Sequence, residues 1–252
     1  MLLAVDIGNT RIKGAVFEGD RLVDLVIFEN KGVQKNIEII LIKYPKIANL
    51  IVSSVGNIKK DGFLSWKTRV NIHFVNQTAH FPFTNLYSTP LTLGVDRMAL
   101  AAGAVIQYPN ENRLIVDAGT CITYDFVDDN NNYHGGAISP GIRLRYESLH
   151  QYTSNLPLLT IEDLKINENE NGKLALIGDS THQSIHSGVV NGVVNEIDGF
   201  ITQYKEKYPN FIIILTGGDT DFLAKRLKNT IFANSNFLLE SLNKIYQYKI
   251  QK

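Results

Sequence analysis

Two short turns in this chain carry residue types that could hold phosphate and metal ions. The first follows the apolar run 2–5 and has the sequence D-I-G-N-T at residues 6–10. Glycine and asparagine favour a tight turn whose exposed backbone N–H groups, with the Thr10 hydroxyl, can cradle a phosphate. Asp6 can hold a hydrated Mg2+ beside that phosphate, and Lys13 can add positive charge. An ordinary β-hairpin explains the same residues, because short glycine-containing motifs recur by chance.

The second turn repeats the first. Residues 115–120 have the sequence I-V-D-A-G-T, again an apolar run followed by aspartate, a small residue, glycine and a hydroxyl residue. A strand-like run at 122–127 and a turn at 128–132 follow it. Two such turns, about 110 residues apart, indicate a duplicated domain. A further buried-strand run, 211–215, ends in T-G-G-D at residues 216–219.

A third candidate for chemistry stands at the start of a helix. G-V-D-R at residues 94–97 precedes the small-residue run 98–104, which predicts a helix that can approach a neighbour closely. Asp96 falls in the first turn, where a carboxylate gains about 0.3–1 kcal/mol from the helix dipole, so helix stabilisation accounts for it as well as catalysis does. A solvated surface charge is the corresponding alternative for Arg97.

Four more segments surround these candidates. The loop at 77–93 carries Tyr87, and loops often carry binding groups. Y-H-G-G-A-I-S-P-G at 133–141 indicates either backbone that closely approaches another group or a bulged edge strand. Residues 179–183, D-S-T-H-Q, contain a capping box that starts the longest helix. An apolar stripe at 185–204 predicts that one face of this helix is core or oligomer interface, and its three glycines fit close packing.

The remaining reactive residues give weak signals. His182 and His186 stand four apart, but without further metal-ligand spacing the pattern favours solvated helix histidines over a zinc pair. Cys121 follows the second turn, and we expect it to be a buried small apolar residue.

Composition limits the class of protein. The chain has 252 residues, with 44% hydrophobic and 20% charged residues, as is typical of a globular protein of one or two domains. Lys plus Arg equals Asp plus Glu at 25 each, which argues against nucleic acid or an anionic membrane as the main partner. A single cysteine excludes an internal disulfide, and neither a signal peptide nor a membrane span is evident. We therefore expect a cytoplasmic protein.

Strands and helices must alternate to position these groups. Beyond the runs already named, strands are expected at 22–28, 50–55 and 72–75, and helices at 33–44, 57–69, 142–152, 221–227 and 237–248. This alternation predicts an α/β fold. The polar stretch at 109–112 suggests a boundary between an N-terminal domain, 1–112, and a C-terminal domain, 113–252.

The duplicated turns and the T-G-G-D segment resemble the actin, heat-shock ATPase and sugar kinase superfamily. That resemblance implies two duplicated actin-like (ribonuclease H-like) domains that face each other across a nucleotide cleft. Within the superfamily, the order of D-I-G-N-T-x-x-K, G-V-D-R, V-D-A-G-T, G-G-x-I-x-P-G, L-P at 156–157 and the helix start at 179–181 resembles the type III pantothenate kinases. The similarity extends from residue 6 to about residue 219, and the cysteine at 121, where a smaller residue is expected, is a conservative departure.

The resemblance implies a role for each matched position. It implies ATP contacts at Asp6, Ile7, Gly8, Asn9, Thr10, Arg11, Ile12, Lys13 and Thr120. It implies pantothenate contacts at Tyr87, Gly94, Val95, Asp96 and Arg97, and at Thr181, which would reach the partner's site in a homodimer. Asp6 would hold Mg2+ through water, and Asp117 would bind the monovalent cation, K+ or NH4+.

The implied reaction is phosphoryl transfer from ATP to pantothenate, the first step of coenzyme A synthesis. Asp96 would be the catalytic base, with a pKa depressed by the helix N-terminus, and Arg97 would pair its fork with the pantothenate carboxylate or with phosphate. The alternatives are another small-molecule kinase of the superfamily and a non-catalytic nucleotide-sensing accessory protein. The residues alone lead only to a phosphotransferase with two lobes.

Overall fold

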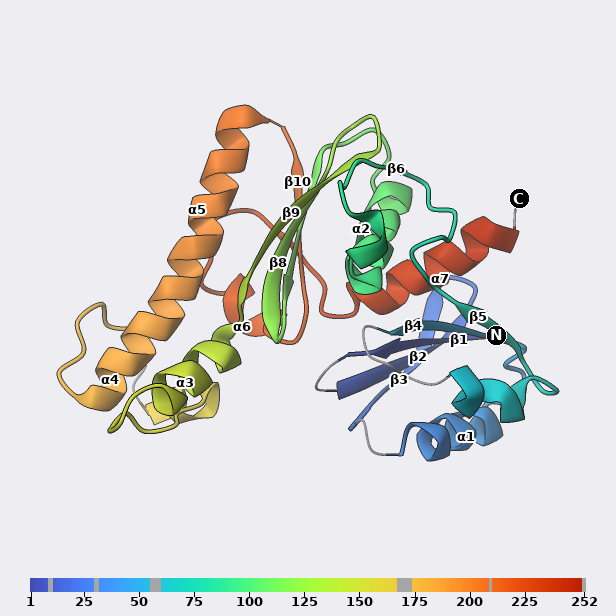
Figure 1. Ribbon diagram of the computed structural model, residues 1–252, viewed down its shortest axis with the longest axis horizontal. Coiled ribbons are helices and arrows are strands. Elements are labelled where there is room, and N and C mark those ends of the chain that lie inside the picture. Colours follow the sequence, from blue (N-terminus) through green and yellow to red (C-terminus); the bar gives the residue numbers. More distant parts are fainter. Residues whose placement is uncertain (9–10, 30–31, 55–59, 167–173, 209, 251–252) are drawn as a thin grey trace. The chain divides into compact units, whose positions relative to one another are not determined.

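The computed structural model describes residues 1–8, 11–29, 32–54, 60–166, 174–208 and 210–250 (Figure 1). The strands are β1 Leu2–Ile7, β2 Arg11–Glu18, β3 Arg21–Glu29, β4 Asn49–Ser54, β5 Asn71–Phe74, β6 Thr84–Asn85, β7 Arg113–Ala118, β8 Cys121–Val127, β9 Asn132–Pro140, β10 Ile212–Thr216 and β11 Phe232–Ala233. The α-helices are α1 Val33–Lys43, α2 Val95–Gln107, α3 Ile142–Gln151, α4 Thr181–His186, α5 Gly192–Lys207, α6 Thr220–Ala224 and α7 Phe237–Ile250. Short 3-10 turns lie at Lys60–Trp66, Pro90–Thr92 and Ile161–Ile166, and a π-helical segment lies at Ser187–Asn191.

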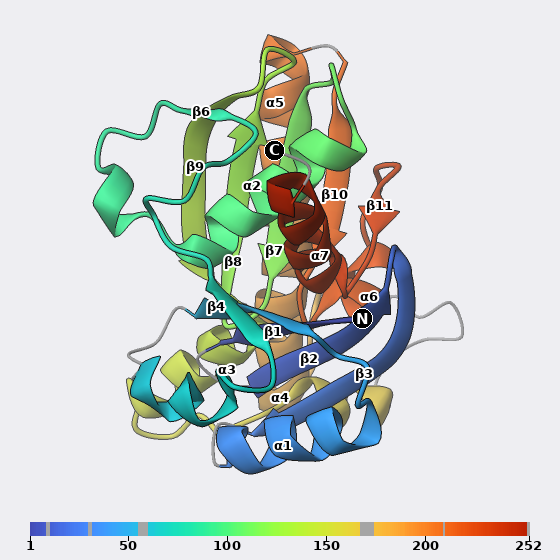
Figure 2. The ribbon, with the colours of Figure 1, turned by 90° about the vertical axis from the view of Figure 1, so that its right-hand side faces the viewer.

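Among the described residues, the first sheet has five strands in the order β3-β2-β1-β4-β5. Strands β1, β2 and β3 form an antiparallel meander, and β4 and β5 add to it in parallel. Helix α1 buries Ile37, Ile40 and Leu41 against one face of this sheet, and α7 covers the other face (Figure 2). Two-sided covering explains why β1 and β4 are almost continuously buried, because neither face meets water.

The second sheet repeats the first. Within the described part of the chain its order is β11-β10-β7-β8-β9-β6. The two orders are the same when β7, β8 and β9 take the places of β1, β2 and β3. Strands β10 and β11 then take the places of β4 and β5, and β6 is an additional strand beside β9. The short β6 runs parallel to β9, pairing Thr84 with Asn132 and Asn85 with Tyr133. The duplication that the two D-x-G turns predicted is therefore confirmed by topology.

The small-residue helix α2 packs closely against α7, and both belong to the same compact unit. A Cβ added at Gly103 would lie 1.9 Å from Ser241 Oγ and 2.9 Å from Ser241 Cα. Glycine is therefore required where the two helices cross, which confirms the prediction of a close neighbour. Alanines on both sides of Gly103, such as Ala102 and Ala104, are completely buried.

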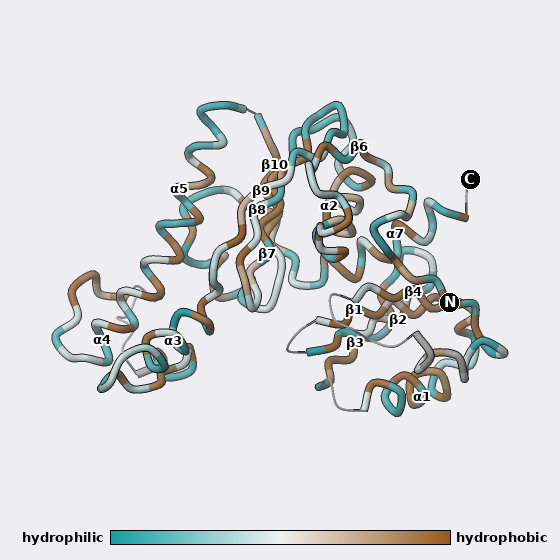
Figure 3. Tube along the Cα trace, in the orientation of Figure 1, coloured by the Kyte–Doolittle hydropathy of each residue, from teal (hydrophilic) through white to brown (hydrophobic). Residues whose placement is uncertain are grey.

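The longest helix predicted from the sequence is a succession of α4, the π-helical segment and α5. Its capping box is partly confirmed, because Ser180 Oγ accepts the Gln183 N–H at 3.3 Å, while Gln183 Oε1 accepts from Asp179 rather than Ser180. Helix α5 alternates hydrophobic and hydrophilic residues along its length (Figure 3). Its stripe, with Ile185 ahead of it, is buried within this chain at Val193, Ile197 and Ile201.

Burial shows that most of the stripe forms core within this chain, which is one of the two alternatives that the sequence offered. Tyr204, at the end of the stripe, is only half-buried, and the contribution of the stripe to an oligomer interface stays a prediction. Among the described residues, a Cβ added at Gly188 or Gly199 would meet nothing within 4 Å, so these two glycines are not required for close packing within this chain. Glu196 of α5 ties the helix to the sheet by accepting hydrogen bonds from Tyr124 at 2.8 Å and Ser139 at 2.5 Å.

Compactness divides the chain into two units. Unit 1 comprises Met1–Arg113, Asp125–Gly135 and Asn236–Lys252, and unit 2 comprises Leu114–Tyr124 and Gly136–Ser235. The division near residue 113 lies at the polar stretch proposed from the sequence, whereas α7 and the β8–β9 turn are grouped with the N-terminal part. The boundary between the duplicated halves at residue 112 stays a prediction from the sequence.

Local differences from expectation have simple causes. The helix expected at 57–69 is a 3-10 helix at Lys60–Trp66, and residues 55–59 lie outside the described part of the chain, as does the polar loop at 167–173. Cys121 is exposed rather than buried, because it is the first residue of β8 beside the turn.

No helix among the described residues is long and apolar enough to span a lipid bilayer.

Candidate active site

The first turn places Asp6 and Lys13 on one face of the unit 1 sheet. They are direct partners in the antiparallel register of β1 and β2, so their side chains point to the same side. The Gly8 N–H closes the turn on the Arg11 carbonyl at 3.2 Å. A Cβ at Gly8 would lie 3.2 Å from that carbonyl oxygen and 3.9 Å from Asp6 Oδ2, so the Asp6 carboxylate stands beside the turn backbone.

The other residues expected at this turn divide into two groups. Ile7 and Ile12 are buried in the core of unit 1, so only their backbone groups can reach a nucleotide. Arg11 is exposed at the start of β2. Asn9 and Thr10, expected to contact ATP, lie outside the described residues.

Sequence reasoning missed Ser53 beside this turn. It is the register partner of Asp6 on the parallel strand β4, so both side chains lie on one face. Ser53 is completely buried, and its Oγ has no hydrogen-bond partner within the described part of the chain. An unsatisfied buried hydroxyl costs free energy, which a ligand or ordered water recovers.

The second turn gathers oxygen atoms in unit 2. A Cβ added at Gly217 would lie 2.5 Å from Asp117 Oδ1 and 2.2 Å from the Ala118 carbonyl oxygen. One added at Gly141 would lie 2.1 Å and 2.7 Å from the carbonyl oxygens of Gly119 and Thr120. These glycines therefore leave room for the second turn to pack closely against residues 141 and 217, with Asp117 Oδ1 and the Ala118 carbonyl oxygen both beside Gly217. Such a set suits a hard cation.

The T-G-G-D segment packs directly against this second turn. Gly217 has a φ of 100°, which only glycine adopts readily, and the Asp219 N–H donates to the Ala118 carbonyl at 3.0 Å. Burial, with the nearby charge of Glu162, raises the pKa of Asp219 to about 6 although Arg143 opposes the shift. Sequence analysis assigned Asp219 no individual role.

Asp96 is the second residue of α2, directly after the N-cap Gly94 and Val95. A Cβ added at Gly94 would lie 2.4 Å from Asp96 Oδ1, so a glycine is required for the carboxylate to turn back over the start of the helix. Asp96 Oδ1 accepts the Arg97 N–H at 2.8 Å. Burial raises the pKa of Asp96, the Arg97 N–H opposes this, and the charge of Asp125 adds to the rise. The expected depression of the pKa is therefore wrong, because desolvation outweighs the helix terminus.

Arg97 is buried and forms an ion pair that the sequence did not predict. Its Nε and Nη2 donate to Asp125 Oδ1 at 2.9 Å and 2.7 Å, and the side chains are 6% and 0% exposed. Burial lowers the pKa of Arg97, but Asp125 more than offsets this and raises it. The alternative of a solvated charge is wrong, and Asp125 occupies the fork that was expected to bind a substrate anion. The feature of the sequence that could have predicted this ion pair was a single carboxylate, Asp125, within a largely apolar strand.

Tyr87 belongs to the same group of side chains, and its ring packs against Gly135 of β9. Its ring lies 5.7 Å from the Arg97 guanidinium carbon, and its loop is fixed where the Leu86 N–H donates to the Tyr133 carbonyl at 3.0 Å. Gly135 has a φ of 94°, and a Cβ there would lie 2.8 Å from Tyr87 Cδ2. The backbone of the G-G segment, which was expected to approach another group closely, therefore approaches the ring of Tyr87.

The structure thus brings the expected residues together in separate groups. Unit 1 holds the Asp6 and Lys13 pair and the group formed by Tyr87, Asp96 and Arg97. Unit 2 holds Asp117 and Thr120 in one turn. Thr181 is exposed at the first residue of α4 in unit 2.

His186 is buried, so the expectation of a solvated helix histidine is wrong at this position. It is 1% exposed, and its Nδ1 shares a hydrogen bond with the Tyr146 hydroxyl at 2.8 Å. Among the described residues no group of three or more His, Cys, Asp or Glu side chains is placed to hold a metal ion.

The chain matches known proteins over its whole length. Residues 2–203 match the family model of type III pantothenate kinases. A type III pantothenate kinase from Flavobacterium johnsoniae is 61% identical over 99% of both chains. One from Flavobacterium psychrophilum is 57% identical, over 99% of this chain and 100% of its own.

Solved structures share the fold at low identity. A Campylobacter jejuni protein described as a Baf family transcriptional activator has a TM-score of 0.61 at 22% identity, covering 99% of this chain and 100% of its own. A Listeria monocytogenes protein described as an N-acetylmannosamine kinase has a TM-score of 0.57 at 15% identity, covering 98% and 99%. These likenesses confirm the α/β, actin-like fold class. The match to the family model and the full-length identity to its members show that this chain belongs to the type III pantothenate kinase family.

Proposed function

We propose that this protein transfers the γ-phosphoryl group of ATP to the primary hydroxyl of pantothenate, giving 4′-phosphopantothenate and ADP as the first step of coenzyme A synthesis. Membership of the kinase family supports the reaction. The observation that carries it within the site is the Asp96 carboxylate, which lies at the start of α2 beside Gly94 and accepts the N–H of Arg97, whose guanidinium lies over the Tyr87 ring.

The Asp6 turn would bind the phosphates. Backbone N–H groups around Gly8, with Asn9, Thr10 and the charge of Lys13, would hold the phosphate oxygens. Kinases of this family act with a metal ion, which neutralises charge on the transferred phosphoryl group. Mg2+ fits here, because Asp6 presents a carboxylate and Ser53 a buried unpartnered hydroxyl on the same face.

The second turn would bind the monovalent cation. Its ligands would be Asp117 Oδ1 and the carbonyl oxygens that crowd Gly217 and Gly141. Oxygen donors of this kind suit K+ or NH4+, and Thr120 would contact ATP beside them. The position of Asp117 Oδ1 and the Ala118 carbonyl oxygen beside the same glycine, Gly217, supports the assignment.

Asp96 would accept the proton of the pantothenate hydroxyl as the bond to phosphorus forms. Its buried position keeps its pKa above the ordinary aspartate value, which makes it a better base than an exposed aspartate. Tyr87, Gly94, Val95 and Arg97 would line the pantothenate pocket. Because Asp125 engages the fork of Arg97, this arginine would act on substrate through its charge and its remaining edge.

Thr181 would complete the site of a partner subunit in a homodimer. Its exposure at the start of α4 leaves the hydroxyl accessible to a second copy of the chain. The enzyme would work in the cytoplasm, which its single cysteine and lack of internal disulfide fit.

The test is ADP release by purified protein with ATP and Mg2+, with and without pantothenate, in K+ and again in Na+. We expect release that requires both pantothenate and K+. Release that ignores pantothenate would point to another acceptor among small-molecule kinases. ATP binding without any release would contradict the kinase proposal and favour a nucleotide-sensing protein. Equal rates in K+ and Na+ would contradict only the cation site.

A further inference from the structure

Asp125 is a completely buried carboxylate that the proposed reaction does not use directly. It lies in β8 and receives three hydrogen bonds at Oδ1: from Arg97 Nε at 2.9 Å, from Arg97 Nη2 at 2.7 Å and from the Tyr133 hydroxyl at 2.6 Å. The Arg97 Nε also lies 3.2 Å from Oδ2. All of these residues belong to unit 1.

A buried ion pair is weak evidence for stability, because hydrophobic residues of similar volume often serve as well. What distinguishes this ion pair is that its arginine lies in the first turn of α2, next to Asp96. Arg97 directly follows Asp96, and the Arg97 N–H donates to Asp96 Oδ1 at 2.8 Å. Fixing the Arg97 side chain therefore fixes the first turn of α2, from which the Asp96 carboxylate projects. The same guanidinium lies over the Tyr87 ring.

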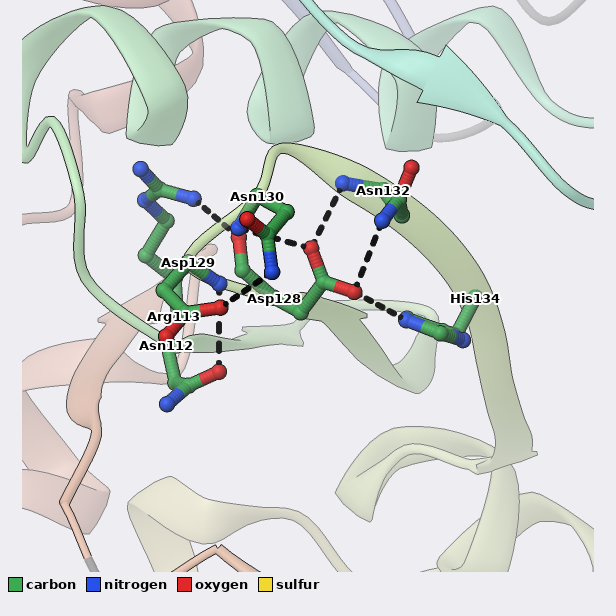
Figure 4. A network of polar contacts seen from close by, with 7 residues as sticks. All are labelled: Asn112, Arg113, Asp128, Asp129, Asn130, Asn132 and His134. Carbon is green, nitrogen blue, oxygen red and sulfur yellow. Dashed lines mark hydrogen bonds and ion pairs between the residues drawn. The ribbon is translucent and has the colours of Figure 1, made fainter.

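The support behind Asp125 is a tightly bonded turn between β8 and β9 (Figure 4). Asp128 accepts hydrogen bonds from the Asn132 N–H at 2.8 Å and from His134 Nε2 at 2.7 Å. The buried Arg113 donates to the Asp128 carbonyl at 2.7 Å and to Asn131 Oδ1 at 3.0 Å.

This turn also anchors the loop that carries Tyr87. The Thr84 N–H donates to the Asn131 carbonyl at 2.9 Å, and the Leu86 N–H donates to the Tyr133 carbonyl at 3.0 Å. One rigid hairpin end therefore supports both Asp125 with Tyr133 and the loop of Tyr87.

We propose that Asp125, held by Tyr133, is a positioning residue for phosphoryl transfer: it fixes Arg97, and through it the orientation of Asp96 and Tyr87. The inference rests on the proposed function. Asp125 does not contact the substrate. Its effect is on the geometry of the base, and small displacements of a catalytic group can cost about 100-fold in rate.

The experiment compares Tyr133→Phe and Asp125→Asn with Asp24→Asn. Asp24 is a matched control in the same unit, because it also accepts from a tyrosine and a cation: from Tyr44 at 2.8 Å and Lys43 at 2.8 Å. Each protein is assayed for kcat and for both KM values, and ATP-binding sites are titrated so that kcat is expressed per folded site. Tyr133→Phe removes one hydroxyl and no charge, which keeps the test valid if Asp125→Asn fails to fold.

We expect kcat per site to fall about 10-fold in Tyr133→Phe and about 100-fold in Asp125→Asn, with the KM for ATP within twofold of wild type. Asp24→Asn should keep the wild-type kcat. A Tyr133→Phe variant with wild-type kcat would overturn the proposal, whether or not Asp125→Asn folds, and so would an equal loss in Asp24→Asn. Wild-type protein without pantothenate-dependent turnover would overturn the proposed function and this inference together, whereas unaffected variants of an active enzyme overturn the inference alone.

Discussion

At the scale of single residues, the proposed chemistry depends on a competition between burial and the helix terminus at Asp96. The N-terminus of α2 favours a charged carboxylate, but burial and the neighbouring charge of Asp125 favour the neutral form, and burial is the larger effect. The result is a carboxylate whose pKa lies above its ordinary value of 3.8. A base in phosphoryl transfer benefits from such a rise.

Replacing Asp96 by Asn should abolish turnover while the fold and ATP binding remain. We expect kcat to fall by about 100-fold or more, since general-base help contributes roughly 10²–10⁴-fold. ATP binding, measured by titration calorimetry, should stay within twofold of wild type. Wild-type kcat in this variant would exclude Asp96 as the base.

The pH profile of wild-type kcat gives an independent measure of the same carboxylate. The base acts only when deprotonated, so kcat should fall as pH decreases through the Asp96 pKa. Because that pKa is raised, the midpoint of the fall should lie above the ordinary value of 3.8. A midpoint at or below that value would show that the carboxylate is solvated in the working enzyme.

At the scale of elements, the site depends on how closely α2 can approach α7. A helix that starts with the proposed base, Asp96, needs a fixed axis, and the crossing at Gly103 and Ser241 supplies it. Small side chains allow this approach, but glycine in a helix costs about 0.5–1 kcal/mol relative to alanine. This cost is offset where atoms of the neighbouring helix occupy the space that a Cβ would fill.

Gly103→Ala should therefore destabilise the protein, by about 1–3 kcal/mol, because its Cβ would overlap Ser241 down to the Cα. Gly199→Ala on α5 is the matched control, since a Cβ there meets nothing within 4 Å. This control should gain about 0.4–1 kcal/mol. Urea unfolding followed by circular dichroism gives both values. Equal stability of the two variants would contradict the packing argument.

At the scale of the whole molecule, the same strand order occurs twice, and each copy carries a D-x-G turn after its first strand. The copies have diverged in what surrounds the turn. In the first, Lys13 lies in register with Asp6, which suits phosphate. In the second, carbonyl oxygens gather around Gly217 and Gly141, which suits a cation.

The proposed homodimer predicts complementation between two impaired variants. Thr181→Ala should raise the KM for pantothenate more than the KM for ATP, and Asp96→Asn should be inactive. When the two are co-expressed, half of the dimers are mixed, and each mixed dimer has one site with an intact Asp96 and a partner's intact Thr181. At low pantothenate we expect recovery of about a quarter of wild-type activity. No recovery above the sum of the separate variants would contradict the contribution across the dimer.

The sequence alone determined the duplicated fold, both D-x-G turns and the family, because these depend on local signals. Strand periodicity, turn residues and the order of motifs do not require knowledge of which segments meet in space. It also placed Tyr87 and Asp96 in one group through the family resemblance.

Only the tertiary structure decided the environment of each group. The partner of Arg97 lies 28 positions away, on a strand where Asp125 gave no signal beyond a charge in an apolar run. The direction of the Asp96 pKa shift, the exposure of Cys121 and the burial of His186 likewise depend on what packs around them. Burial and pairing are set by residues distant in sequence, and one sequence gives no measure of such contacts.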